Sequence, residues 1–449
     1  MTTGSTKWTN EFLDEKRKQG DPFADHAAAA LFEAVAGRSK EEVGAFIASF
    51  VSKDFSKHWK VHPLIPDPPE LVAYFENFDD FQLTPAEVTI LEKGAEFFEK
   101  NGPKITFALG VRSLLKQYAH TKAIEVLRLT TLLVKHVNRR ILETMQFVLD
   151  VMSPGWAKTL PNGKVELNLN HPGLMTVKKL RLVHAMVRYR LQHKMYDTSL
   201  GEYNIDQLGF PINQEDMVFA IHTFSLEIIE GLREMRVPVT EAEAENYFQC
   251  WKIMGRALGV SRDLEPASYA DAIDLQELIY KRHFTLPNAS GPILSTALMH
   301  WFVTAVPLLE EKTLVTFIRD FNGPENYDIL KDHLKIDIGN AHADLKAHLS
   351  DDLHFEEKTA NGPGLKGPKG DLAFDNFFLH FIRTLITTER GGKDETFRIG
   401  DGFIAAWDLN RMNEKPLSKI DVFLLAVKTF FKNLIDTLKS FFEKPGKAG

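Results

Sequence analysis

KKLRLVHAMVRYRL (residues 178–191) and GFPINQEDMVFAIHTFS (residues 209–225) open and close the stretch around which the rest of the chain is organised. In the first segment, apolar residues recur at spacings of 3 and 4, at Leu180, Val183, Val187 and Leu191. This spacing indicates an amphipathic helix. The same helical periodicity prevails along the chain, whereas the alternation typical of strands is rare. The sequence therefore predicts an all-α protein.

One histidine lies within this apolar series. Arg181 precedes His184 by three residues and Arg188 follows it by four, so on a helix the three side chains lie on nearly one face. An imidazole between two guanidinium groups suits a flat, apolar cofactor with a metal at its centre and carboxylates at its edge, and haem is the obvious candidate. The alternative is an ordinary core histidine, which is the commoner role for a lone histidine on an apolar helix face.

Several helix starts are marked by capping boxes, at residues 39–42, 84–87 and 240–243. The helix that begins at Pro85 is expected to end by the Asn-Gly-Pro sequence at residues 101–103. Strand-like alternation appears briefly in KVELNLN, residues 164–170. We therefore expect at most one small hairpin.

The chain shows neither an internal repeat nor a linker long enough to separate independent domains. We expect a single large helical domain at residues 20–415, an N-terminal arm at 1–19, and an amphipathic C-terminal helix and tail at 416–449. Within the last segment, residues 417–444 carry an apolar stripe opposite a lysine-rich side. We expect this helix to dock on the protein's own core, with peripheral contact with a membrane surface as the alternative.

Composition places the chain among ordinary soluble globular proteins, with 44% hydrophobic and 26% charged residues in a length of 449. The net charge of -7 argues against a general nucleic-acid surface. The single cysteine, Cys250, excludes an internal disulfide and a thiolate metal cage, and is expected to be a small buried hydrophobe. Because neither a secretory signal nor a run of about 18 apolar residues is visible, we expect a cytoplasmic protein.

A second pair of candidate residues lies upstream, in RRILETMQFVLD at residues 139–150. Arg140 and Thr144 are four residues apart, which places both on one helix face. Arg140 could lie over the polar edge of a cofactor or near bound oxygen, and Thr144 could donate a hydrogen bond there. The alternative is a surface arginine and a threonine packed within its helix.

Six segments, in this order, resemble the latex-clearing-protein (rubber oxygenase) family and its MpaB-type oxygenase relative. They are GDPFADHAAAALFEA (20–34), RRILETMQFV (139–148), PGWAKTLPNGK (154–164), LRLVHAMVRYRL (180–191), GFPINQEDM (209–217) and ENYFQCWKIMGRALGV (245–260). The resemblance covers roughly residues 20–260. No single motif is decisive, but six in the same order are specific.

The resemblance implies a haem b protein with an all-α, globin-like core. By that resemblance His184 is the proximal iron ligand, Arg181 and Arg188 support the haem and its propionates, and Arg140 and Thr144 lie near the haem. The haem is expected to be bound non-covalently, because the sequence has no Cys-x-x-Cys-His motif.

The chain departs from the family pattern at one of these positions. In rubber oxygenase, a lysine that can cap the iron on the distal side directly precedes the threonine, whereas this chain has Glu143. Glu125, on the preceding helix, is a candidate base. The activity implied is oxygenation: O2 enters a C=C bond of a hydrophobic, isoprenoid-like small molecule, which breaks into two carbonyls. The alternatives are a non-enzymatic haem protein that binds or senses O2, and a helical protein without cofactor.

Overall fold

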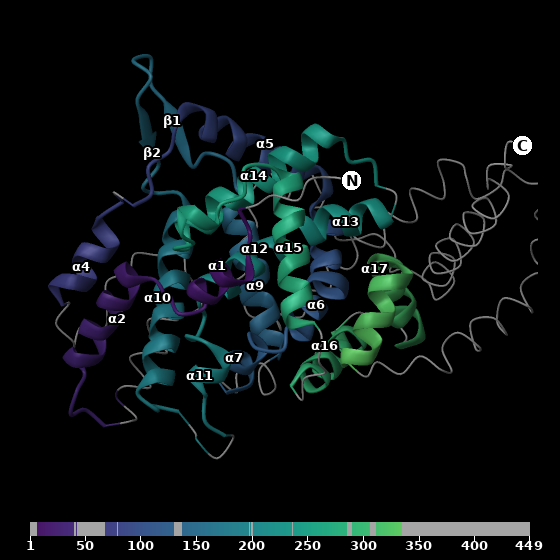
Figure 1. The fold of residues 1–449 in the computed structure, drawn as a ribbon. Helices are drawn as coiled ribbons and strands as arrows, with labels where there is room; N and C mark the ends of the chain where they lie inside the picture. Colours follow the sequence, from purple (N-terminus) through teal and green to yellow (C-terminus); the bar gives the residue numbers. More distant parts are fainter. Residues whose placement is uncertain are drawn as a thin grey trace, which may run out of the picture.

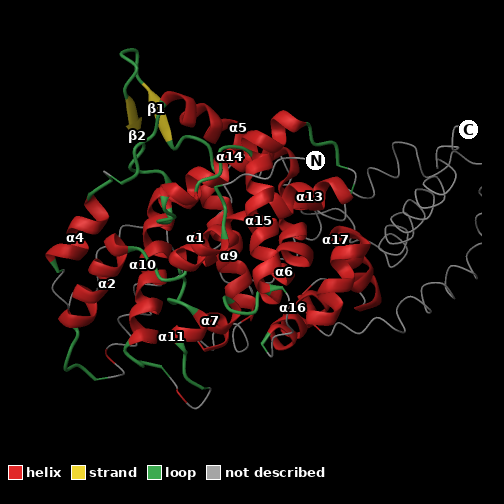
Figure 2. Ribbon diagram, in the orientation of Figure 1, coloured by secondary structure: helices red, strands yellow, loops and turns green. Residues whose placement is uncertain are grey.

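The fold is built almost entirely from helices, as the periodicity predicted (Figure 2). The computed structural model describes residues 7–39, 42, 68–78, 80–129, 137–196, 198, 201–235, 237–284, 290–305 and 311–334. Among these residues, β-structure is confined to one antiparallel hairpin of β1 (Ala157–Thr159) and β2 (Val165–Leu167), in which Lys158 pairs with Glu166. The expected small hairpin is thus confirmed.

The helix that carries His184 is α10 (Pro172–Gln192). Two N-terminal helices, α2 (Pro22–Ala34) and α4 (Pro69–Glu76), pack beside it and lie at the left of Figure 1. Their apolar residues and one flank of α10 form a separate small core, which includes Ala24, Leu31, Phe32, Leu71, Phe75, Leu182 and Met186. One flank of α10 is therefore covered, which leaves a different face for a site.

The remaining described helices build the larger core of the molecule. They are α1 (Asn10–Lys16), α5 (Pro85–Ala108), the π-helical turn η1 (Leu109–Ser113), α6 (Leu114–Ala119), α7 (Ile124–Leu129), α9 (Val137–Val151), α11 (Ile205–Leu208), α12 (Gln214–Phe224), α13 (Leu226–Glu234), α14 (Glu241–Ala257), the short 3₁₀ helix η3 (Arg262–Leu264), α15 (Tyr269–His283), α16 (Gly291–Ala305) and α17 (Glu311–Leu334). Helices α5 and α14 pack together closely. At their contact, a Cβ on Gly94 would collide with the Sγ of Cys250, which is buried as expected.

The three capping boxes predicted from the sequence are present in the structure. Thr84 with Glu87 and Thr240 with Glu243 form complete capping boxes at the starts of α5 and α14. Ser39 and Glu42 exchange the same two hydrogen bonds, at 2.9 and 3.1 Å. These contacts form within four residues, so the sequence alone determines them.

The predicted end of α5 at residues 101–103 is wrong, because the helix continues through Pro103 to Ala108. Proline inside a helix removes one backbone hydrogen bond. Here the surrounding turn is buried: Phe98, Ile105 and Phe107 all lie in the main core. Burial of this apolar surface offsets the cost of the proline, and that packing is not visible in a local sequence pattern.

The C-terminal segment, residues 416–449, lies outside the described residues, so its docking on the core or on a membrane stays a prediction. The proposed boundaries at residues 20 and 416 also stay predictions. Within the described part of the chain, no helix combines the length and apolar character needed to cross a membrane.

Candidate functional site

A cavity of ≈ 300 Å³ lies among α9, α10, α12 and the segment formed by α6 and α7. Apolar side chains provide most of its lining, and a few polar side chains are spaced among them. A largely apolar cavity with a small number of polar groups is the usual form of a small-molecule or cofactor site. It is therefore the candidate functional site.

Helix α10 lines this cavity with the apolar face that contains His184, as the sequence predicted. Leu180, Val183, His184 and Val187 are only half-buried, although the neighbouring flank of the same helix is covered by α2. These positions are three or four residues apart and so form one helix face. Among the described residues that line the cavity, His184 is the one histidine.

Helix α9, which packs directly against α10, supplies another part of the lining. Glu143, Thr144 and Phe147 line the cavity from this helix, so the structure brings Glu143 and Thr144 to the same cavity as His184. Arg140 belongs to the first turn of α9, but its side chain lies outside the described part of the structure. Its place near the cofactor stays a prediction.

The sequence predicted that Arg181 faces the cofactor pocket. In the structure its guanidinium is held by carboxylates outside the cavity lining. Its Nε and Nη2 donate to the two Asp21 oxygens at 2.5 and 2.8 Å, and its Nη1 donates to Asp80. The side chain is buried against the N-terminal segment. The structure therefore gives Arg181 a carboxylate partner within the protein itself.

Arg188 also faces the N-terminal segment rather than the cavity. Its Nε donates to Asp25 Oδ1 at 2.6 Å and its Nη1 to the Ile212 carbonyl at 3.3 Å. Successive residues are about 100° apart around a helix. With that geometry Arg181 and Arg188 fall on one side of His184, while Leu180, Val183 and Val187 fall on its other side. In this structure neither arginine lines the cavity, and a role for either toward the cofactor stays a prediction.

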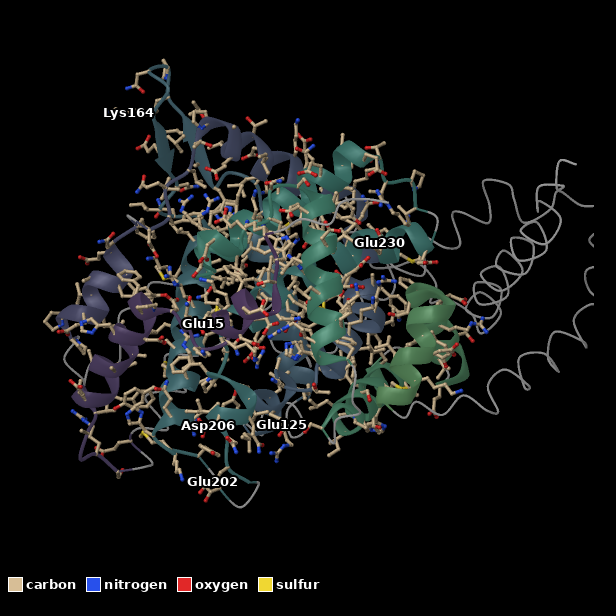
Figure 3. The ribbon with its side chains drawn as sticks, in the orientation of Figure 1. Glu15, Glu125, Lys164, Glu202, Asp206 and Glu230 are labelled. Carbon is tan, nitrogen blue, oxygen red and sulfur yellow. The ribbon has the colours of Figure 1, made fainter. Side chains whose placement is uncertain are left out.

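Glu125, the candidate base, does not line the cavity. Its neighbours Val126 and Leu127 do, whereas its own oxygens accept hydrogen bonds from Arg128 Nε at 2.7 Å and Ser290 Oγ at 2.6 Å. Glu125 lies toward the lower edge of the molecule in Figure 3. A carboxylate in this position is turned away from any molecule in the cavity.

We expect Glu125→Gln to leave oxygen consumption nearly unchanged once the haem-loaded protein is assayed. Loss of its partly exposed ion pair with Arg128 should cost only about 0–1 kcal/mol of stability. If Glu125 were the general base, the same change would lower the rate by roughly 10²–10⁴-fold. Oxygen-electrode rates of the wild type and the variant, normalised to haem content, separate these outcomes.

Asp216 is a cavity-lining residue that the sequence did not reveal as functional. It lies in the first turn of α12 and is buried. Its Oδ1 accepts a hydrogen bond from Arg17 Nη1 at 2.9 Å and its Oδ2 accepts one from Asn213 Nδ2 at 2.8 Å. Burial raises the pKa of Asp216, and the charge of Arg17 opposes that rise. The cap at Asn213 was readable from the sequence, but the ion pair with Arg17 was not.

The loop before α12 carries backbone strain at the cavity. Ile212 lines the cavity with a φ of 49°, which is unfavourable for a β-branched residue. Such conformations persist only where surrounding contacts enforce them, and they are common at binding sites. The hydrogen bond from Arg188 to the Ile212 carbonyl is one such contact.

The fold and the site together define a helical protein that encloses an apolar cavity with one imidazole in its lining. The family model described as "ER-bound oxygenase mpaB/B'/Rubber oxygenase, catalytic domain" matches residues 102–331. The chain belongs to this family, which confirms the resemblance carried by the six motifs. The matched residues include α9, α10 and α12, so the cavity lies within the catalytic domain.

Two known proteins are similar to this chain. The chain is 31% identical over 116 residues to the rubber oxygenase of Streptomyces sp. (strain K30); this alignment covers 25% of the chain and 27% of that protein. The structure of the latex clearing protein LCP in the closed state matches with a TM-score of 0.56 at 19% identity, over 83% of this chain and 91% of that one. The structural match confirms the all-α fold.

Proposed function

We propose that this chain is a haem b-dependent oxygenase that cleaves C=C bonds of a hydrophobic, unsaturated, isoprenoid-like small molecule with O2. The observation that carries the proposal is the half-buried face of α10, on which His184 lies among apolar side chains that line the cavity. Membership of an oxygenase family supports the reaction class. The chain's similarity to a rubber oxygenase and to a latex clearing protein supports an unsaturated polymer or its fragments as the model for the substrate.

The donor set fits haem better than a free metal ion. No group of three or more His, Cys, Asp or Glu side chains suited to a metal occurs among the described residues. Haem brings four nitrogen ligands with it and needs one axial ligand, such as an imidazole, together with apolar walls. When bound, it supplies the chemistry of oxygen activation, and the protein supplies ligation, orientation and pocket polarity.

The other walls of the cavity give the chain's own residues distinct roles. We assign the apolar side chains, such as Phe147 and Phe224, to hold the alkene and exclude water. The Thr144 hydroxyl can donate a hydrogen bond within the cavity, and Arg140 is proposed to lie over the polar edge of the cofactor. We propose a small isoprenoid, rather than a solid polymer, as the molecule that these apolar walls hold beside the cofactor.

The test combines spectroscopy with product analysis. The purified full chain, oxidised and then reduced with dithionite, should show the spectrum of haem b. Haem-loaded protein is then incubated with terpenes, carotenoids and polyisoprene oligomers under ¹⁸O2. Labelled aldehydes or ketones support the proposal, whereas a haem spectrum without oxygen consumption favours an oxygen-binding protein. A colourless protein that takes up no added haem would contradict both.

Substitutions at Glu143 test whether this position of α9 lies close to the iron of the proposed cofactor. We expect Glu143→Lys to shift the ferric spectrum toward a six-coordinate, low-spin form, because Glu143 lines the cavity and a lysine there would supply an amine that can ligate iron. Glu143→Gln is the matched control, since it removes the charge without adding a ligand. Identical spectra for the two variants would show that residue 143 does not approach the iron.

A further inference from the structure

A buried cluster of charges lies behind the α12 wall of the cavity. Its centre is Arg17, the C-cap residue of α1, whose side chain is 5% exposed. Arg17 Nη1 donates to Glu215 Oε2 at 3.1 Å and to Asp216 Oδ1 at 2.9 Å, and its Nη2 donates to the Leu208 carbonyl. One side chain thus joins the first helix of the chain to the helix that carries a cavity wall.

The backbone around Arg17 is equally close to this wall. The Phe210 amide donates to the Arg17 carbonyl at 2.8 Å. Gly209 has a φ of 82°, and a Cβ at this position would lie 3.0 Å from the same carbonyl oxygen. Both the positive φ and the close contact with the Arg17 carbonyl therefore favour glycine at position 209. The loop that leads into α12, with strained Ile212, is consequently folded onto Arg17.

Glu215 and Asp216, the two carboxylates of the cluster, differ in their number of ion-pair partners. Glu215 also accepts from Arg282 Nε at 2.8 Å and lies 3.0 Å from His283 Nε2. For Asp216, Arg17 is the one arginine or lysine within 4.0 Å among the described residues. Asp216 therefore depends on Arg17 for charge compensation in a way that Glu215 does not.

We propose that Arg17 is a positioning residue for the cavity: it compensates the Asp216 carboxylate and keeps the first turn of α12, with the loop before it, in the shape that lines the site. The proposal rests on the proposed function only for the identity of the molecule that occupies the cavity. Removing one partner of a buried ion pair leaves an uncompensated charge, which is far more costly than losing an exposed pair. Without Arg17, Asp216 must take up a proton or draw in water.

The groups that face this cluster determine the expected pH dependence. His120 Nε2 lies 3.9 Å from Asp216 Oδ1, and burial lowers the pKa of His120 well below its usual value. Burial also lowers the pKa of His283. Burial alone would raise the pKa of Glu215, but the hydrogen bond with His283 and nearby cations lower it to about 2.

The outer residues of the cluster complete its charge balance. The pKa of Tyr203 is raised, first by burial and then by the charge of Asp216. Lys122 has its pKa lowered by burial and by Arg17, and Arg282 also pairs with Asp14, whose side chain is largely exposed. None of these groups can replace the guanidinium beside Asp216 at neutral pH. In Arg17→Met, the folded-state pKa of Asp216 should therefore rise further above its unfolded value.

A raised carboxyl pKa makes the folded state relatively more stable at low pH and less stable as the pH rises. The cavity of Arg17→Met should thus be formed at acid pH and be lost as Asp216 ionises. Each pKa unit corresponds to a tenfold change in equilibrium. We expect the affinity of the variant's cavity for a neutral apolar probe to fall about tenfold or more between roughly pH 5.5 and 8.5.

The experiment measures binding of the neutral fluorophore N-phenyl-1-naphthylamine to the full chain without haem, across this pH range. The wild type should show little pH dependence, Arg17→Lys should lie close to the wild type, and Arg17→Met should lose affinity as the pH rises. The double variant Arg17→Met/Asp216→Asn should recover a flat profile, because the buried charge is gone. This readout requires neither haem nor activity, so it stands apart from a failure of the proposed function.

A purely structural role for Arg17 predicts a different pattern. Binding would then fall by the same factor at every pH, and Asp216→Asn would not rescue it. Either result overturns the proposal. Asp216→Asn alone keeps Arg17 paired with Glu215 and should bind the probe with a flat profile, which verifies that the asparagine variant folds.

Discussion

Replacing His184 with alanine is expected to abolish stable haem binding, so that the purified variant loses most of the Soret absorbance of the wild type. The imidazole lies on the one face of α10 that lines the cavity. Without it, the cofactor would lose the bond between its iron and the chain and would exchange readily. The effect should exceed that of any other single change in the cavity wall, because no other described histidine lines it.

The measurement compares haem content and axial-ligand spectra after reconstitution and gel filtration. His193→Ala is the matched control, because His193 lies at the end of the same helix, is exposed, does not line the cavity, and has its Nδ1 2.8 Å from the Tyr189 carbonyl of that helix. Imidazole added to His184→Gly should restore much of the spectrum if the cavity is otherwise intact. Unchanged Soret intensity and an unchanged ligand spectrum in His184→Ala would exclude His184 as the ligand.

The parts of the fold that sequence reasoning predicted well are those that depend on near neighbours. Capping boxes and helical periodicity act within a few residues, which is why the starts of α5 and α14 and the face of α10 could be read directly. The continuation of α5 through Pro103 could not, because it depends on burial against distant helices. Tertiary packing overrides a local helix-breaking signal there.

In the candidate site, too, features that depend on local spacing were predictable from the sequence, whereas ion pairs between distant segments were not. The sequence predicts His184 and Thr144 as members of one site because each belongs to a helix face with a recognisable spacing, and both line the same cavity. The spacing of three and four residues also predicts that Arg181 and Arg188 share a face with His184, but a cavity meets only part of a helix circumference. Their partners Asp21 and Asp25 come from the N-terminal segment, more than 150 residues away, and no local pattern predicts such pairs.

The largest effect on stability is expected at Arg181. Arg181→Met leaves Asp21, which is 3% exposed, as a buried carboxylate without its bidentate partner. Breaking a buried pair by removing one partner typically costs about 3–5 kcal/mol. Asp80 should contribute less to this loss, because its side chain is 31% exposed and water can replace the lost contact.

This loss should appear in the protein without haem, as a lower melting temperature and a lower urea midpoint. The double variant Asp21→Asn/Arg181→Met should recover much of the stability, because it removes the buried charge along with its partner. If Arg181 instead serves the cofactor carboxylates, the haem-free variant would melt like the wild type and only haem retention would fall. The double variant would then rescue nothing, and the ion pair with Asp21 would have no part in holding α10 against the N-terminal segment.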